Sequence, residues 1–224
     1  MRWSRHRHAP WYLGGVSFAL TRQHDSLTQA LPGSSFGSGW SLLGRDVDVL
    51  TNVSLTGREH LGIFNAFADG TKVYLTLPTG ERASFSFLPA IEQIGSLSFY
   101  RPAWSADGSS GWSLNSADAQ LIKAGAGYYD STSGQPYNPA SPAFAGTDYV
   151  LTAPDGTIYS IDATCGTTEM RTPSGSRLFL SDSGITTAGG QTVQFIADAR
   201  GRLGRVVAPD GTFFSFQENS LIGR

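Results

Sequence analysis

Apolar and polar residues alternate over several short stretches of the chain. The clearest stretch is 71–77, where Val73, Leu75 and Leu77 alternate with polar or half-polar residues. A period of two turns one set of side chains toward a core and leaves the other set near water. The same reasoning predicts further short strands at 82–87, 157–161, 177–180 and 212–216.

A glycine-containing turn precedes each of these stretches. The turns are Asp69-Gly70, Thr79-Gly80, Asp155-Gly156, Ser174-Gly175 and Asp210-Gly211, and proline stands directly before the last four. Proline presets φ for a turn, aspartate caps the local backbone, and glycine accepts the positive φ that closes the loop. Turn signals at intervals of about ten residues favour a β-meander, sandwich, barrel or spiral. Units of this size must stack on neighbours to bury a face.

The rhythm of turns divides the chain into four predicted sections. They are a basic tail at 1–8, opening strands at 9–53, an irregular part at 54–147, and regular hairpins at 148–224. Single strands are expected at 12–21 and 63–67, and six or seven strands in the last section. We interpret 101–147, rich in Gly, Ser and Pro, as an insertion with short hairpins near 112–114 and 120–123. No helix is predicted beyond a short turn at 117–124.

The composition agrees with a turn-rich β protein. The 224 residues include 27 glycines, 12% aromatic and 15% charged residues, a balance that argues against disorder. The net charge of −2 gives no sign of a nucleic-acid partner. No apolar run is long enough for a membrane span. The basic N-terminus lacks the apolar run of a signal peptide, because Gly14, Gly15 and Ser17 interrupt it.

Candidate catalytic and metal-binding residues are few. Cys165 is the single cysteine, which excludes a disulfide framework, and we expect it to be partly buried. His6 and His8 lie in a basic tail without a carboxylate or cysteine partner. Asp46 and Asp48 are expected on one face of a strand, but calcium needs more oxygen ligands than two. We therefore predict no cofactor, no metal and no enzymatic activity.

The segment Asp198-Ala199-Arg200-Gly201-Arg202-Leu203, followed by Pro209-Asp210-Gly211, resembles the RHS/YD repeat of bacterial exoproteins and toxins. Upstream, Phe36-Gly37-Ser38-Gly39-Trp40 is similar to the Phe-Gly-x-Gly-Trp element that often precedes such repeats. Ala197 departs from the pattern, because the family has an aromatic residue before the aspartate. The motif itself is structural. Asp198 and Gly201 make a turn, Leu203 points inward, and Arg202 and Arg205 are expected to pair with carboxylates on neighbouring strands.

The resemblance implies an all-β array of antiparallel hairpins that forms a spiralling open sheet, part of a hollow shell. Such shells are extracellular or lie at the cell surface, and in toxin complexes they enclose a toxic segment. The partners of this chain would be neighbouring repeats of the same parent polypeptide. The chain is then expected to be the N-terminal, first-repeat region of a longer protein, exported with that parent. Its last edge, near 212–217, would lack a partner strand and promote association.

Two other functions remain open at this point. A carbohydrate- or protein-binding β-sandwich could use Trp104 and Trp112 as ligand contacts, because both lie in the irregular section. A β-rich hydrolase would need a pair of carboxylates, which can be distant in sequence. Nothing in the sequence singles out such a pair.

Overall fold

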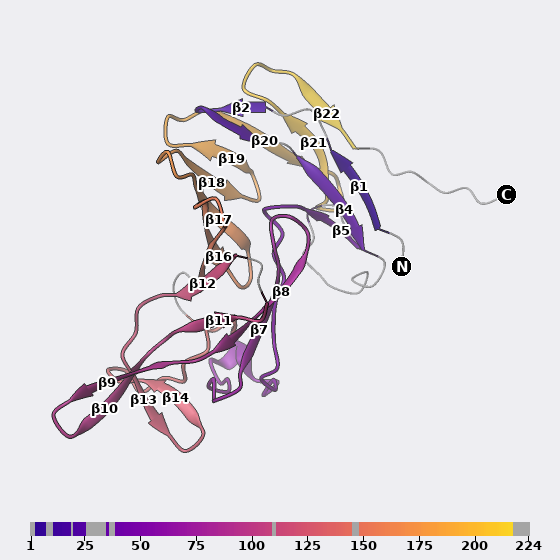
Figure 1. Cartoon of the computed structure of the whole chain (residues 1–224). Helices are drawn as coiled ribbons and strands as arrows, with labels where there is room; N and C mark the ends of the chain where they lie inside the picture. The colour runs from indigo at the N-terminus through magenta and orange to yellow at the C-terminus, as the bar shows by residue number, and fades with distance from the viewer. Residues whose placement is uncertain are drawn as a thin grey trace. The chain divides into compact units, whose positions relative to one another are not determined.

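The fold was analysed in a computed structural model of the chain, drawn in Figure 1. It describes residues 3–7, 11–18, 20–25, 35, 39–108, 111–144 and 148–216. The chain divides into two compact units. Unit 1 combines Met1–Asp46 with Ser174–Arg224, and unit 2 is Val47–Pro173.

The protein belongs to the all-β class, as the sequence predicted. Every strand pairing found in the described residues is antiparallel. The helical content of the described part is one 3-10 turn, η1, at Glu59–Leu61. No helix in that part has the length and apolarity that crossing a membrane requires.

Unit 2 contains three four-stranded arrangements. The first has the order β11-β8-β7-β6 and the second the order β12-β15-β16-β17. The third, β14-β13-β10-β9, consists of two hairpins that Figure 1 shows as two fingers at one end of the unit. The bounds are β6 Val49–Thr51, β7 Lys72–Thr76, β8 Arg82–Phe87, β9 Ala90–Ile94, β10 Leu97–Arg101, β11 Trp104–Ala106, β12 Ser113–Ser116, β13 Leu121–Ala124, β14 Gly127–Asp130, β15 Tyr149–Thr152, β16 Ile158–Asp162 and β17 Gly166–Arg171.

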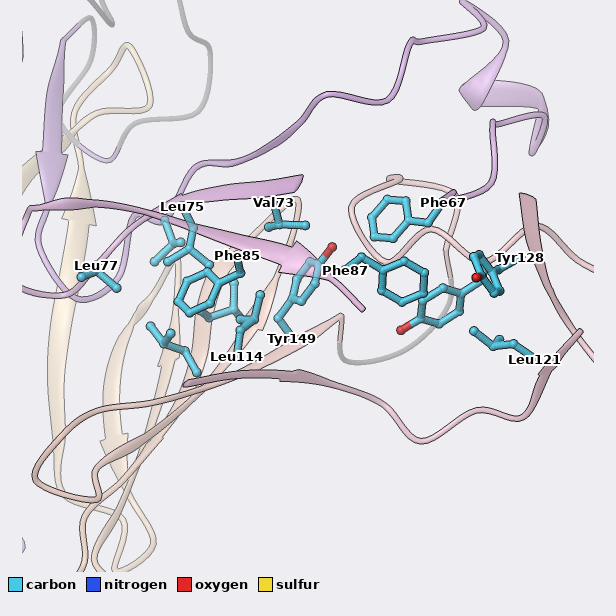
Figure 2. Close-up of a cluster of buried hydrophobic side chains, with 14 residues drawn as sticks. Phe67, Val73, Leu75, Leu77, Phe85, Phe87, Leu114, Leu121, Tyr128 and Tyr149 are labelled. Carbon is cyan, nitrogen blue, oxygen red and sulfur yellow. The ribbon is translucent and has the colours of Figure 1, made fainter. Parts of the chain in front are cut away.

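The core of unit 2 follows from the predicted alternation. Val73 and Leu75 of β7, and Phe85 and Phe87 of β8, are fully buried, and Figure 2 shows them in one cluster with Tyr149 of β15. Side chains of the first two sheets therefore share one core. Aromatic rings extend the cluster toward the third sheet, and Phe87 lies 5.4 Å from Tyr128 of β14 in an edge-to-face contact. The core thus ties all three sheets of the unit together.

Unit 1 contains a meander and two smaller pieces. The meander has the order β18-β19-β20-β21-β22, β1-β4-β5 form a small sheet, and β2-β3 form a hairpin. The bounds are β1 Trp3–Arg7, β2 Trp11–Leu13, β3 Val16–Phe18, β4 Thr21–Asp25, β5 Trp40–Leu42, β18 Arg177–Ser181, β19 Gly184–Thr187, β20 Thr192–Ala197, β21 Leu203–Val207 and β22 Phe213–Ser215. The described part of the section 148–224, residues 148–216, therefore holds eight strands, β15 to β22, where six or seven were predicted for the whole section.

A bulge interrupts the pairing of β20 with β21. Ile196 lies opposite Arg205, but the next residue, Ala197, lies opposite Leu203, so Gly204 is an extra residue. Leu203 and Val206 are both buried although an odd number of positions separates them. The bulge thus changes which positions of β21 face the core.

Three segments of the chain fold differently from the sequence prediction. The stretch 12–21 is not one strand, because Gly14 and Gly15 adopt φ of +54° and +83° and turn the chain between β2 and β3. The stretch 63–67 forms no strand. The N–H of Phe67 instead donates to the carbonyl of Tyr137 (2.8 Å), and its carbonyl accepts the N–H of Tyr128 (2.9 Å). Both partners lie more than sixty residues away in the sequence.

The third wrong prediction concerns 101–147. The described part of this stretch contains β11 to β14, and it is not an insertion outside the sheets. Only β13 and β14 form the expected local hairpin. Strand β12 pairs with β15, and β11 pairs with β8. Both strands are short, and each is stabilised by pairing with a strand outside this stretch.

Candidate functional site

A five-residue turn recurs in both units and is the most repeated local structure of the chain. The N–H of its first residue donates to the carbonyl of the fifth, and the carbonyl of the first accepts the N–H of the fourth, a glycine. All ten of these N···O distances lie between 2.7 and 3.0 Å. The five turns span 77–81, 153–157, 187–191, 198–202 and 208–212.

The sequence Pro-Asp-Gly-Thr explains two of the five turns. Gly156 and Gly211 have φ of +84° and +83°, a region that side chains with a Cβ rarely enter. The carboxylate of Asp210 accepts the N–H of Thr212 at 2.9 Å and its hydroxyl at 2.7 Å. These hydrogen bonds hold the pKa of Asp210 below its usual range. The turn dipeptides found in the sequence therefore have the conformation that was predicted for them.

The turn that carries the RHS-like motif uses its aspartate differently. Asp198 occupies the first position, and its Oδ1 accepts the N–H groups of Arg200 (2.8 Å) and Arg202 (2.9 Å). Its Oδ2 accepts Nε and Nη2 of Arg202 at 2.9 and 2.8 Å. The backbone N–H of Arg202, and then its guanidinium, hold the pKa of Asp198 below its usual range. Asp198, Gly201 and Arg202 thus form one closed turn.

The partners of two arginines differ from the sequence prediction. Arg202 binds a carboxylate of its own turn, whereas a carboxylate on a neighbouring strand was expected. The guanidinium of Arg205 lies 4.6 Å from the centroid of the Phe213 ring on β22. This is a cation–π contact across two strands. Both arginines therefore reinforce the hairpin locally.

A backbone hydrogen bond of Leu203 joins the segment of the Asp-x-x-Gly-Arg-Leu motif to Ser35, which directly precedes the Phe-Gly-x-Gly-Trp element. The side chain of Leu203 is buried, as the alternation predicts, and its N–H donates to the carbonyl of Ser35 at 2.6 Å. Gly39 has φ of +75°, and Trp40 is half-buried on β5. Phe36 and Gly37 lie outside the described residues. The motif turn and the segment around the Gly-Trp element therefore lie together in unit 1.

An ionic cluster around the buried side chain of Arg45 lies beside this segment, and no pattern in the sequence indicates it. Arg45 is 7% exposed and donates from Nη1 to Asp46 and to the Ser35 hydroxyl, both at 2.7 Å. Its Nη2 donates to Asp182. Asp46 also accepts the N–H of Leu42 at 2.8 Å. A buried arginine that is fully paired fixes the geometry of a loop more than it adds stability.

The carboxylates of Asp46 and Asp48 do not share one face, because 46–48 is not a strand. Asp48 accepts hydrogen bonds from the hydroxyl of Thr76 (2.5 Å) and from Arg82 in unit 2. The prediction that both carboxylates lie on one face of a strand is therefore wrong. Within the described residues, no three His, Cys, Asp or Glu side chains gather as a metal would require.

Trp104 and Trp112 are both half-buried and pack against the core of unit 2. The Trp104 ring lies 5.1 Å from Phe87 and 5.6 Å from Tyr149, and its Nε1 donates to Ser116 at 3.3 Å. Trp112 lies 6.1 Å from Tyr159. The contacts of both rings are those of core residues, which leaves only part of each available to a ligand.

Cys165 is exposed, so the prediction of partial burial is wrong. It lies between β16 and β17, where its N–H donates to Asp162 Oδ1 at 2.8 Å. A residue at the outer end of a hairpin cannot reach the core, and the sequence did not reveal that this position was a turn.

One hollow of the described surface is a candidate site and offers little chemistry. It measures about 350 Å³, lies in unit 1 and is lined by Gly14, Ser176, Thr187 and Gln191, with Arg177 as the single charged side chain of its lining. The Arg177 guanidinium lies over the Phe179 ring at 5.7 Å. Neither a nucleophile beside a base nor a pair of carboxylates is found among the residues that line this hollow.

No protein-family model matches the chain, and no curated protein is detectably similar to it.

Proposed function

We propose that this chain is a non-enzymatic structural segment of a larger RHS/YD-type protein of the cell surface or the extracellular space. In this role its hairpins stack in series as part of a spiralling shell, and its partners are the neighbouring repeats of the same polypeptide. In the parent protein such a shell encloses a toxic segment or mediates contact at the surface.

The observation that carries the proposal is the recurrence of one five-residue turn with the same pair of backbone hydrogen bonds. The copy at 198–202 uses the residues of the family motif, Asp198, Gly201 and Arg202, for the turn itself. Side chains that are engaged in this way shape the backbone and leave no group free to activate a nucleophile or a water. A motif of this kind favours an architectural role.

The physical basis is that a hairpin of this length cannot bury an apolar face alone. Each one gains stability from the interface with its neighbour, so that the stability of an array grows with the number of units. The meander β18 to β22 fits this scheme, because consecutive strands pair in the order of the sequence.

The test is to lengthen the array by one unit. A second copy of residues 198–216 is inserted directly after Phe216, so that the duplicated turn follows β22. We expect the midpoint of urea unfolding to rise and the β signal in circular dichroism to grow. In the control, the glycines of the inserted copy that correspond to Gly201 and Gly211 are replaced by valine. That control should gain nothing, because both positions need positive φ.

An inserted copy that exchanges its amide hydrogens as fast as an unfolded peptide, with an unchanged midpoint, would contradict the proposal. If the chain is instead a ligand-binding module, the inserted copy is also expected to stay unfolded and to leave the midpoint unchanged. Glycan-array binding that is lost when Trp104 becomes Ala would then identify that alternative.

A further inference from the structure

The β9–β10 hairpin of unit 2 carries an unusual concentration of exposed apolar side chains. Ile91, Ile94 and Leu97 are 66%, 52% and 61% exposed, and Leu88, just before β9, is 58% exposed. Neither face of the distal hairpin is covered, because Ile94 and Leu97 lie on one face and Ile91 lies on the other. Exposed apolar side chains that gather on one hairpin make it a candidate for an interaction surface.

The hairpin also has an open edge, since β9 is the terminal strand of the order β14-β13-β10-β9. Residues of an antiparallel strand alternate between pointing their backbone groups toward the partner strand and away from it. Ile94 and Leu97 flank the two-residue loop Gly95-Ser96 and form a hydrogen-bonded pair in such a hairpin. Ile91 and Gln93 therefore point their N–H and C=O groups to the open edge.

We propose that this edge is a homodimer interface, in which β9 of one copy pairs antiparallel with β9 of a second copy about a two-fold axis at Ile91. The sheets of the two copies then join into one. The inference concerns unit 2 and does not depend on the proposed architectural role. The edge predicted from the sequence to promote association, near 212–217, belongs to unit 1.

The side chains select this register. With the axis at Ile91, Ile91 of one copy lies opposite Ile91 of the second copy on one face of the joined sheet. On the other face, Leu88 of each copy lies opposite Ile94 of the other. An axis at Glu92 would place two carboxylates directly opposite each other, which is unfavourable. An axis at Gln93 would place Ile91 opposite Gly95, which has no side chain to cover it. Pro89, which has no N–H, still offers its carbonyl to Gln93 of the second copy.

The size of the patch sets the strength of the dimer. A fully exposed Leu or Ile side chain presents on the order of 100 Å² of apolar surface, so these four side chains expose roughly 250 Å² per copy. With the flanking backbone, the interface remains below the roughly 1,200 Å² of total buried area that is typical of stable complexes. The dimer is therefore weak and forms in a concentration-dependent manner.

The first test is sedimentation velocity of the full chain over a wide range of concentration. We expect the wild type to shift from monomer to dimer, and Ile91→Lys to remain a monomer throughout. Leu55→Lys is the matched control, because Leu55 is 82% exposed in the same unit but lies outside the hairpin, and it should dimerise like the wild type. Phe213→Lys tests the β22 edge and should also dimerise. A wild type that stays monomeric, or an Ile91→Lys variant that still dimerises, overturns the proposal.

The second test fixes the register by cross-linking in a Cys165→Ser background, because Cys165 is exposed and would react. Under mild oxidation, Ile91→Cys should form a covalent dimer. Ile94→Cys alone should not, since its counterpart in the second copy lies out of reach, whereas Leu88→Cys together with Ile94→Cys should. Equal cross-linking of Ile91→Cys and Ile94→Cys would show random collision and would overturn the register.

Discussion

Asp148 provides the most direct test of the energetics of unit 2. Its residue is 3% exposed, and Oδ2 accepts the N–H of Ala163 from the turn between β16 and β17. Burial raises the pKa of Asp148 to about 6 from an ordinary value of 3.8. The hydrogen bond from Ala163 opposes this rise, and the nearby charge of Asp162 adds to it.

The sign of the effect follows from the raised pKa. Below about pH 4 the carboxyl is protonated in both the folded and the unfolded protein, and stability is at its full value. Between about pH 4 and pH 6 the unfolded chain has lost the proton and the folded protein keeps it, so stability falls as pH rises. A difference of about two pKa units corresponds to about 3 kcal/mol of unfolding free energy lost by pH 7.

The perturbation is Asp148→Asn, which keeps an oxygen for the Ala163 N–H and removes the charge. The new amide donors offset part of the gain, because an unpaired buried donor costs about 1–3 kcal/mol. The pH dependence is thus the cleaner quantity. We expect the wild type to lose about 3 kcal/mol relative to the variant between about pH 4 and pH 7.

The assay is urea unfolding followed by tryptophan fluorescence at a series of pH values for both proteins. Asp155→Asn is the control, because hydrogen bonds from Thr157 lower the pKa of Asp155. Its stabilising contribution is therefore lost as pH falls, the opposite direction. Parallel curves for the wild type and Asp148→Asn across this pH range would refute the reasoning.

Three further substitutions test the core and the turns. Phe87→Ala should lower the unfolding free energy by about 3–5 kcal/mol, because the ring is fully buried; Phe179→Ala, at a position 42% exposed, should cost far less in the same urea titration. Trp104→Ala should cost about 2–3 kcal/mol, less than a fully buried tryptophan, and differential scanning calorimetry would detect the lower midpoint; an unchanged midpoint would show that the ring does not support the core. Gly156→Ala should cost about 1–2 kcal/mol, since φ is +84° there, and an unchanged urea midpoint would show that the turn relaxes.

Local features of the fold could be predicted from the sequence. The alternation of Val73, Leu75 and Leu77 predicts β7, and Phe85 and Phe87 mark the buried face of β8. Both depend on a period of two within one strand. The turn glycines were equally predictable, because positive φ is a local requirement that few other residues meet.

Features that depend on distant partners could not be predicted. Strand β12 is short and polar, and its partner β15 is more than thirty residues away. Arg45 is buried and donates hydrogen bonds to Ser35 and to Asp182, which is more than 130 residues away, and nothing near Arg45 in the sequence indicates its burial. Cys165 is exposed because it lies in the turn between β16 and β17, and the sequence did not indicate this turn because it contains neither a proline nor an Asp-Gly pair.

The bulge at Gly204 shows how this meander keeps its alternation of buried and exposed side chains, which has a period of two residues. Thr187 and Asp198, each the first residue of a turn, are eleven positions apart. Because this number is odd, the two side chains fall on opposite sides of the alternation, and Thr187 is buried whereas Asp198 is not. The extra residue Gly204 restores the phase, so that Val206 and Ala208 face the core again. A one-residue insertion in any strand therefore turns the following side chains to the opposite face of the sheet, and a bulge that absorbs one residue turns them back. Lineages of such arrays should gain or lose strand residues in pairs, or acquire a glycine nearby when they do not.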